Sequence, residues 1–157
     1  MTSPPPGVGE PLRIVDRYLD GTTLRLRQVG DDRSAVFKLG QKIRAVADDP
    51  FLVWMTTLYL SAAEHRRLSV LPAAVLVKSR RRVRHEGTWY AVDEFAGALQ
   101  GLVLAETELA ETELAGGTTA LPGGLPTWLG REVTSDDRYS GATLARRGLP
   151  AGWQPGG

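Results

Sequence analysis

Charged and apolar residues alternate along four separate stretches of the chain, and this alternation limits what the chain can fold into. In an extended strand successive side chains point to opposite faces, so residues of equal parity share a face. Each stretch then has one charged face and one apolar face, which is typical of an antiparallel sheet. The charged faces carry Arg25, Arg27, Lys38, Lys78, Arg80, Arg82 and Arg84 on basic strands, and Glu106 and Glu108 on an acidic strand.

The other elements place these strands in hairpin order. The pattern predicts strands over 12–20, 22–29, 34–42, 51–60, 74–85, 88–95 and 101–109, and helices over 62–71 and 135–147. The first two strands flank Asp20-Gly21, which is a hairpin signal. Segment 1–11 and tail 148–157 are rich in proline and glycine and are predicted to be flexible. The sequence therefore predicts one α+β domain over 12–147, built on an antiparallel sheet or barrel of about seven strands with two or three helices.

The strand predicted over 51–60 has no charged residue, which is typical of a strand that is buried on both faces or covered by a helix. The helix after it begins at Ser61, and Glu64 three positions later completes a capping box.

Composition excludes several classes of function. The chain has no cysteine, and its two histidines have no spacing for a zinc site or for a nucleophile–base pair. The net charge of +1 does not favour nucleic acid, and the longest apolar run, 70–77, is too short to span a membrane. The first residues lack the pattern of a signal peptide. A soluble cytoplasmic protein that binds neither nucleic acid nor membrane is predicted, and its oligomeric state is left open.

The charged faces allow two interpretations. In the first, the polar face of an antiparallel sheet simply contacts water. In the second, the sheet closes and the charged faces line a cationic interior with an acidic patch. Arginine forks and lysine charges match phosphate oxygens, so this interior would suit a polyanion such as a triphosphate. A carboxylate pair would hold a divalent metal.

Six stretches resemble the CYTH superfamily, which includes inorganic and thiamine triphosphatases and class IV adenylyl cyclases. They are DRYLDGTTLRLRQ, FKLGQK, VLVKSRRR, WYAVDEFAG, GLVLAETEL and PTWLGREVTSDDRYSGATLA, in family order over about 13–145. The resemblance implies a triphosphate tunnel, an antiparallel barrel with inward charges, and a small triphosphate as substrate. It implies that the phosphates are bound by Arg25, Arg27, Lys38, Lys78 and Arg80. Arg82 continues the row of basic residues on the strand of Lys78 and Arg80 and is included as a binding residue. It implies that Glu106 and Glu108, with Asp93, bind Mg²⁺ or Mn²⁺ or orient the attacking water.

The chain departs from the family in its acidic residues. The Glu-x-Glu-x-Lys strand of the family is missing, and the strand over 51–60 lacks the acids that many relatives carry there. Three interpretations stay open: a chain start placed too late, an anion-binding protein without turnover, and a metal-dependent triphosphatase that uses Asp93, Glu106 and Glu108 alone. An adenylyl cyclase is a further alternative.

The stretch LAETE occurs twice in succession and adds Glu111 and Glu113 to the acidic strand. The repeat is five residues long, which is an odd number. On one continuous strand the second glutamate pair would therefore face away from Glu106 and Glu108. The prediction is therefore one candidate metal pair followed by a duplicated extension.

Overall fold

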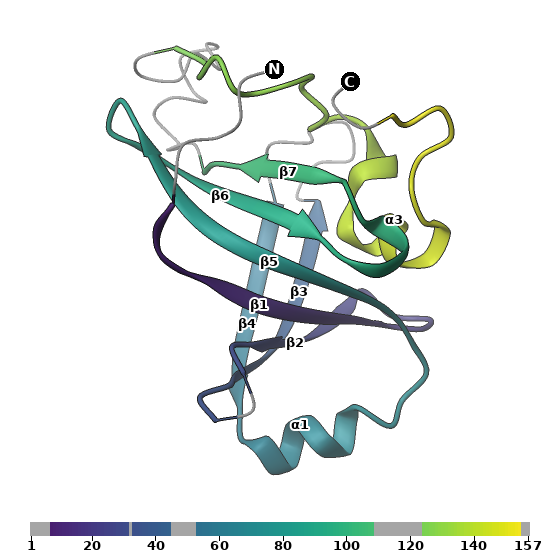
Figure 1. Ribbon diagram of the computed structural model, residues 1–157. Helices are drawn as coiled ribbons and strands as arrows, with labels where there is room; N and C mark the ends of the chain where they lie inside the picture. The colour runs from purple at the N-terminus through teal and green to yellow at the C-terminus, as the bar shows by residue number, and fades with distance from the viewer. Residues whose placement is uncertain (1–6, 32, 45–52, 109–123, 155–157) are drawn as a thin grey trace.

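Seven antiparallel strands form one sheet in the computed structural model, which describes residues 7–31, 33–44, 53–108 and 124–154. The spatial order of the strands is β4-β3-β2-β1-β5-β6-β7, so β1 lies at the centre of the sheet between β2 and β5 (Figure 1). The strands are β1 (Val8–Leu19), β2 (Leu24–Val29), β3 (Val36–Arg44), β4 (Val53–Leu60), β5 (Ala73–His85), β6 (Thr88–Phe95) and β7 (Val103–Glu106).

The predicted hairpin order and the antiparallel sheet are confirmed, with two differences. β1 begins at Val8, four residues before the predicted strand start. The described strands also form an open sheet in place of the closed barrel, because β4 and β7 are its two edges and do not pair with each other. The described part of β7 ends at Glu106. The second LAETE copy, the start of the predicted 51–60 strand, and both ends of the chain (1–6 and 155–157) lie outside the described residues.

The uncharged strand β4 is not buried, which contradicts its sequence pattern. As an edge strand it contacts only β3 through its backbone, and both of its faces are exposed. Trp54 and Tyr59, which lie on opposite faces of β4, are 71% and 72% exposed. The prediction was wrong because an uncharged sequence does not determine burial. Burial depends on the position of the strand in the sheet, and β4 lies at an edge.

The predicted capping box is confirmed at α1 (Ala62–Leu68). The Ser61 hydroxyl accepts a hydrogen bond from the backbone N–H of Glu64, and the Glu64 carboxylate accepts one from the Ser61 backbone. This reciprocal pair satisfies two donors that a helix start otherwise leaves unpaired. α1 carries the chain from the edge strand β4 to β5, which lies beyond the central strand (Figure 1).

The predicted C-terminal helix forms over its second half, as α3 (Gly141–Arg147) after the short 3-10 turn Asp137–Tyr139. Its residue Leu144 is buried against Leu76 of β5 and Phe95 of β6. Gly141 lies directly against the ring of Tyr18, where any larger side chain would overlap the phenol oxygen. α3 is therefore fixed to one face of the sheet, and a second cluster of Val83, Tyr90 and Val92 packs beneath Trp128 and Leu129 on the other face.

Within the described residues, no helix is both long enough and apolar enough to cross a membrane.

Candidate anion-binding site

One face of the sheet gathers the charges that the sequence singled out. Directly paired residues of antiparallel strands lie on the same face. Arg27 pairs with Asp16 on one side and with Lys38 on the other, and Arg80 pairs with Asp93. We call this set the charged face: Asp16, Arg25, Arg27, Lys38, Lys78, Arg80, Asp93 and Glu106.

The first buried carboxylate on the charged face is Asp16 of β1, which the sequence analysis did not select. Its side chain has no exposed surface, and Arg27 holds it with two hydrogen bonds, Nε to Oδ1 at 2.6 Å and Nη2 to Oδ2 at 2.6 Å. Burial lowers the pKa of Arg27, but the hydrogen bonds and charge of Asp16 outweigh it and raise that pKa above its usual value. This bidentate pair fixes the plane of the Arg27 guanidinium.

Arg25 lies beside this pair and has a donor that makes no hydrogen bond among the described residues. Its Nε is 3.7 Å from the Asp16 carboxylate, and this buried nitrogen has no hydrogen-bond partner among the described residues. Tyr18 lies close to both groups. Burial, with a smaller effect of Asp16, raises the pKa of Tyr18 to about 12, so its phenol stays protonated at neutral pH. A buried donor without a partner is rare in folded proteins and is a place where a ligand atom would be stabilised.

The second buried carboxylate is Asp93 of β6, a predicted catalytic residue. Lys78 Nζ donates to Asp93 Oδ2 at 2.5 Å, while Arg80 donates through Nε at 2.6 Å and Nη2 at 2.7 Å. Burial raises the pKa of Asp93, but Arg80 and Lys78 together outweigh it and hold that pKa below its usual value. Burial lowers the pKa of Lys78, which Asp93 only partly offsets. Asp93 is thus an ionised anchor for two cations, and both of its oxygens are engaged.

The two predicted acids of the β7 stretch lie in different environments. Glu106 ends β7, and its Oε2 is 3.3 Å from Arg80 Nη2, while 58% of its side chain is exposed. Glu108 lies two residues beyond the end of the strand and is exposed. The structure brings Glu106 to the Asp93 pair but does not bring Glu108 there.

The described carboxylates do not fit a divalent metal as they stand. Both oxygens of Asp16 and both oxygens of Asp93 accept hydrogen bonds from cations, while Glu106 accepts one from Arg80 through Oε2 only, so among the described acids of the charged face Glu106 Oε1 alone has no such bond. In the part of the chain that is described, no three acidic or histidine side chains converge closely enough to hold a metal ion. The metal pair Glu106–Glu108 therefore stays a prediction.

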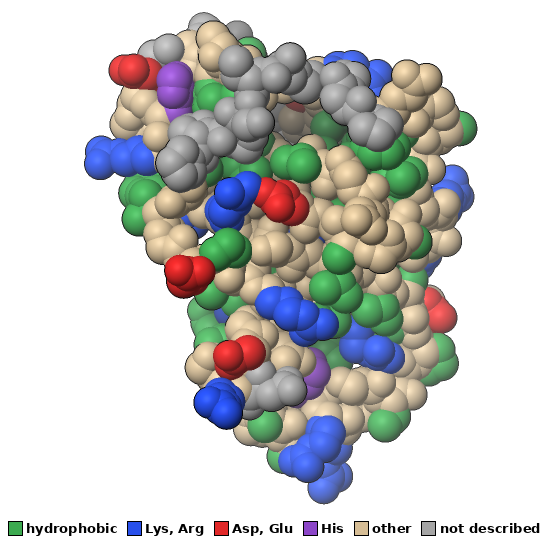
Figure 2. Space-filling view, in the orientation of Figure 1, with side chains coloured by type: hydrophobic (Ala, Val, Ile, Leu, Met, Phe, Trp, Pro, Cys, Tyr) green, Lys and Arg blue, Asp and Glu red, His purple; other side chains and the backbone are tan. Residues whose placement is uncertain are grey.

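The remaining predicted cations make contacts with aromatic rings. Lys38 Nζ lies 5.1 Å from the centre of the Tyr59 ring, and the Arg82 guanidinium lies 4.4 Å from the Trp89 ring. Such contacts are weak at exposed positions and leave the donors available. On the side of the molecule seen in Figure 2, basic side chains are dispersed among apolar ones and form no continuous patch.

The pairing of Asp16 with Arg27 depends on the length of the turn between β1 and β2. Asp16 lies between Arg13 and Arg17 in β1, and it is opposite Arg27 because the turn between β1 and β2 spans the four residues 20–23. A carboxylate at a core-facing position needs a cation at its register partner. The hairpin predicted at Asp20-Gly21 has a shorter turn and therefore another register, so the sequence did not predict this pair.

Comparison with known proteins gives consistent results, although no family model matches the chain. Over 72 residues the chain is 39% identical to an inorganic triphosphatase of Acetivibrio thermocellus, and this match covers 46% of the chain and 42% of that relative. The chain thus spans less than half the length of this curated relative.

The fold is similar to the crystal structure of the inorganic triphosphatase NE1496, with a TM-score of 0.56, 23% identity, and coverage of 90% of this chain and 86% of that chain. A second crystal structure, of the hypothetical protein NE1496, is similar with a TM-score of 0.56 and 22% identity. That match covers 90% of this chain and 89% of that chain. The chain is therefore similar over part of its length to an inorganic triphosphatase, in agreement with the resemblance that the motifs carry, and its open antiparallel sheet is similar in fold to these two crystal structures.

Proposed function

We propose that the protein binds a triphosphate compound on the charged face and hydrolyses it. The observation that carries the proposal is the balance of charge there: five cations and three carboxylates make up the charged face as defined, and Arg82, which the register places on the same side of the sheet, adds to the positive excess. A nearly neutral chain that concentrates positive charge in this way favours a polyanion. The similarity to inorganic triphosphatases supports phosphate as that polyanion.

The contacts of the charged face indicate which cations would bind first. A guanidinium has five N–H donors, and the carboxylates use only some of them on Arg27 and Arg80. Among the described residues, Arg25 Nε has only the 3.7 Å contact with Asp16 and no hydrogen bond, and Lys38 has no carboxylate within ion-pair distance. Arg25 and Lys38 would therefore make the main contacts to phosphate, while Asp16 and Asp93 keep the other cations oriented.

Replacing Arg25 by alanine is expected to weaken the binding of inorganic triphosphate by about tenfold or more, since a hydrogen bond between charged groups contributes about 1.5–3 kcal/mol. Isothermal titration calorimetry at fixed salt measures this change. Arg81→Ala is the matched control, because Arg81 lies next to Arg80 on the opposite face and pairs with the exposed Glu94. Its affinity should stay within about twofold of the original. Equal losses in both variants, or no binding by the unaltered protein, would refute the site.

Hydrolysis is assigned to Glu106, whose Oε1 has no hydrogen bond from a cation among the described residues. Glu106 lies beside Arg80, where a carboxylate could orient a water molecule against a bound phosphate. Glu106→Gln is expected to lower phosphate release at least about tenfold while triphosphate affinity is kept. Release is measured from inorganic triphosphate, ATP and thiamine triphosphate with Mg²⁺ or Mn²⁺ in the buffer, and cyclic AMP is assayed in the ATP samples.

The second candidate is a triphosphate-binding protein without turnover, which the engaged oxygens of Asp16 and Asp93 favour. Binding of triphosphate without phosphate release under any of these conditions would establish this candidate and overturn the hydrolytic one.

A further inference from the structure

Tyr18 of β1 lies between the start of α3 and the arginine that has a donor without a partner. It is directly opposite Arg25 of β2, so the two side chains share the charged face. Its ring packs against the apolar cluster that includes Leu76 and Leu144. Its phenol oxygen lies against Gly141, the first residue of α3, so closely that a side chain there would overlap it. Tyr18 thus contacts the helix on one side and a candidate phosphate-binding cation on the other.

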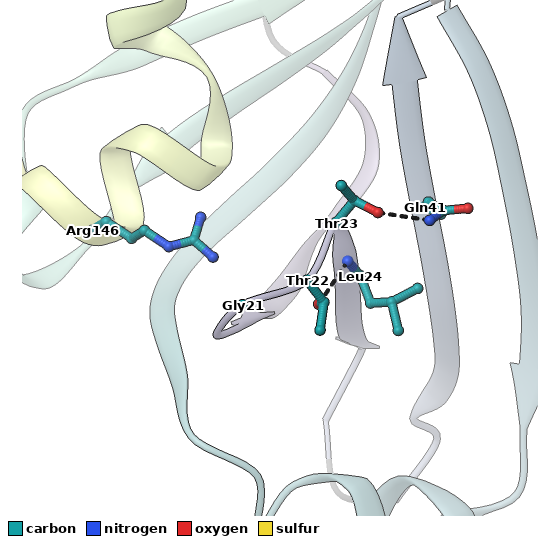
Figure 3. Close-up of a pocket in the computed structure, with 6 residues that line it drawn as sticks. All are labelled: Gly21, Thr22, Thr23, Leu24, Gln41 and Arg146. Carbon is teal, nitrogen blue, oxygen red and sulfur yellow. Dashed lines mark hydrogen bonds between the residues drawn. The ribbon is translucent and has the colours of Figure 1, made fainter.

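The contact with Tyr18 differs from the rest of the boundary between α3 and this hairpin. Figure 3 shows Arg146 of α3 extending toward the turn at Gly21 and Thr22, and a hollow of about 700 Å³ is lined by both elements. At Gly141, by contrast, the helix has no side chain, and its backbone lies directly against the phenol. Tyr18 is therefore a point at which the position of α3 determines the position of a side chain on the charged face.

Three groups surround the Arg25 side chain. Its Nε is 3.7 Å from Asp16, which is too far for a hydrogen bond. Its Nη2 lies over Gly40 of β3, where an added Cβ atom would be 3.6 Å away. The third group is the phenol of Tyr18. Burial has the largest effect on the pKa of Tyr18 and raises it, while the charge of Arg25 and a hydrogen bond from Arg25 lower it. The phenol oxygen is thus an acceptor for Arg25.

Asp16 competes with the phenol for the Arg25 guanidinium. Each Asp16 oxygen accepts one hydrogen bond from Arg27, and a carboxylate oxygen can accept about two. A movement of about 1 Å would turn the present 3.7 Å contact into a hydrogen-bonded ion pair. Arg25 would then donate to an acid of the protein in place of a ligand. A neutral acceptor that holds Arg25 away from Asp16 keeps this donor available.

We propose that Tyr18 is a positioning residue for phosphate binding, whose hydroxyl, held in place by Gly141, keeps Arg25 apart from Asp16 and directed to the ligand. The proposal rests on the proposed function, since Arg25 is the cation assigned to triphosphate there. Tyr18 acts through Arg25 and needs no contact of its own with the ligand. The C-terminal helix therefore contributes to binding through one phenol.

The test is a double-mutant cycle, with the affinity for inorganic triphosphate measured by calorimetry on the whole chain at one salt concentration. Tyr18→Phe keeps the packed ring, removes the hydroxyl, and should weaken binding about fivefold. In an Arg25→Ala background the same replacement should change the affinity by less than about twofold, because the residue through which it acts is gone. A merely structural role would weaken binding by the same factor in both backgrounds.

Tyr139→Phe is the matched control. The Tyr139 ring packs against the same apolar cluster, and its hydroxyl accepts a hydrogen bond from Arg131. Its loss should leave the triphosphate affinity within about twofold of the original. Gly141→Ala displaces the phenol from the helix side and should weaken binding about as much as Tyr18→Phe, again only where Arg25 is present. If Gly141→Ala does not fold, the Tyr18 cycle decides alone.

The outcomes separate the two claims. If the unaltered protein does not bind triphosphate, the proposed function fails and the positioning role fails with it. If triphosphate binds and Tyr18→Phe leaves the affinity unchanged, the positioning role alone is refuted. Equal losses with and without Arg25, or equal losses in the Tyr18 and Tyr139 variants, would also refute it.

Discussion

Replacing Asp93 by alanine is expected to lower the free energy of unfolding by about 3–5 kcal/mol, the range measured when one partner of a buried ion pair is removed. Lys78 is only 7% exposed, and both Lys78 and Arg80 would lose the carboxylate that balances their charge. A desolvated ammonium group without a partner is strongly unfavourable. Urea denaturation at neutral pH measures the change, with the circular dichroism of the sheet as the signal.

The control for Asp93 is its neighbour Glu94. Glu94 pairs with Arg81 on the opposite face, and 46% of its side chain is exposed, so Glu94→Ala should cost about 1 kcal/mol or less. Similar losses for the two variants would show that the Lys78–Asp93–Arg80 group is not a buried network. Such a result would also remove the assigned role of Asp93 as an anchor for the cations.

The buried Asp93 carboxylate also predicts how the free energy of unfolding depends on pH. The folded pKa of Asp93 lies below its ordinary value of 3.8, so the unfolded chain takes up a proton first as the pH falls. The stabilisation from Asp93 is therefore complete above pH 3.8 and is lost as the pH falls through the folded pKa. Asp93→Asn should remove this part of the acid dependence, which urea titrations at several acidic pH values would detect.

Replacing Asp16 by alanine is the second large effect expected, again about 3–5 kcal/mol of unfolding free energy. Asp16 is fully buried in the central strand, and Arg27 would keep its charge without the two hydrogen bonds that now compensate it. Glu10→Ala is the control, because Glu10 is an exposed acid of the same strand. Its cost should be within about 0.5 kcal/mol.

A double replacement separates pairing from simple loss of packing. If Asp16 and Arg27 act as one unit, the Asp16→Ala/Arg27→Ala variant should be more stable than the sum of the two single changes predicts, by about 1 kcal/mol or more. Strictly additive costs would contradict the pairing. Arg25 remains in every variant, so the cycle measures the Asp16–Arg27 interaction itself.

The sequence predicted well which residues share a face of each strand, and predicted poorly how buried the strands are and which side chains contact one another. The alternation of Arg25 and Arg27 with leucine determines which side each residue takes, because the period of a strand is two residues. Alternation placed Glu106 on the charged side of its strand, whereas Asp93 was selected only through the family resemblance. The register shows that both share the face of Arg80. Local signals were also sufficient at Ser61, where the cap depends only on residues three positions apart.

What the sequence did not predict depends on strand order and on long-range contacts. The exposure of Trp54 follows from the place of β4 at the edge of the sheet, which no local pattern contains. The engagement of both Asp93 oxygens by Lys78 and Arg80 follows from side-chain geometry within one hairpin. Alternation showed that these residues were neighbours, but it could not show that the cations would occupy the oxygens that a metal needs.

The central position of Asp16 has a consequence for how the chain aligns its strands while folding. Sliding β1 by one residue against β2 would turn Asp16 to the other face, and sliding it by two would separate it from Arg27. The Asp93 pair restricts β5 and β6 in the same way. Because an unpaired buried charge costs several kcal/mol, misaligned sheets are disfavoured far more strongly than apolar packing alone would disfavour them. The residues that would hold a phosphate chain therefore also select, without any ligand, the correct alignment of the strands.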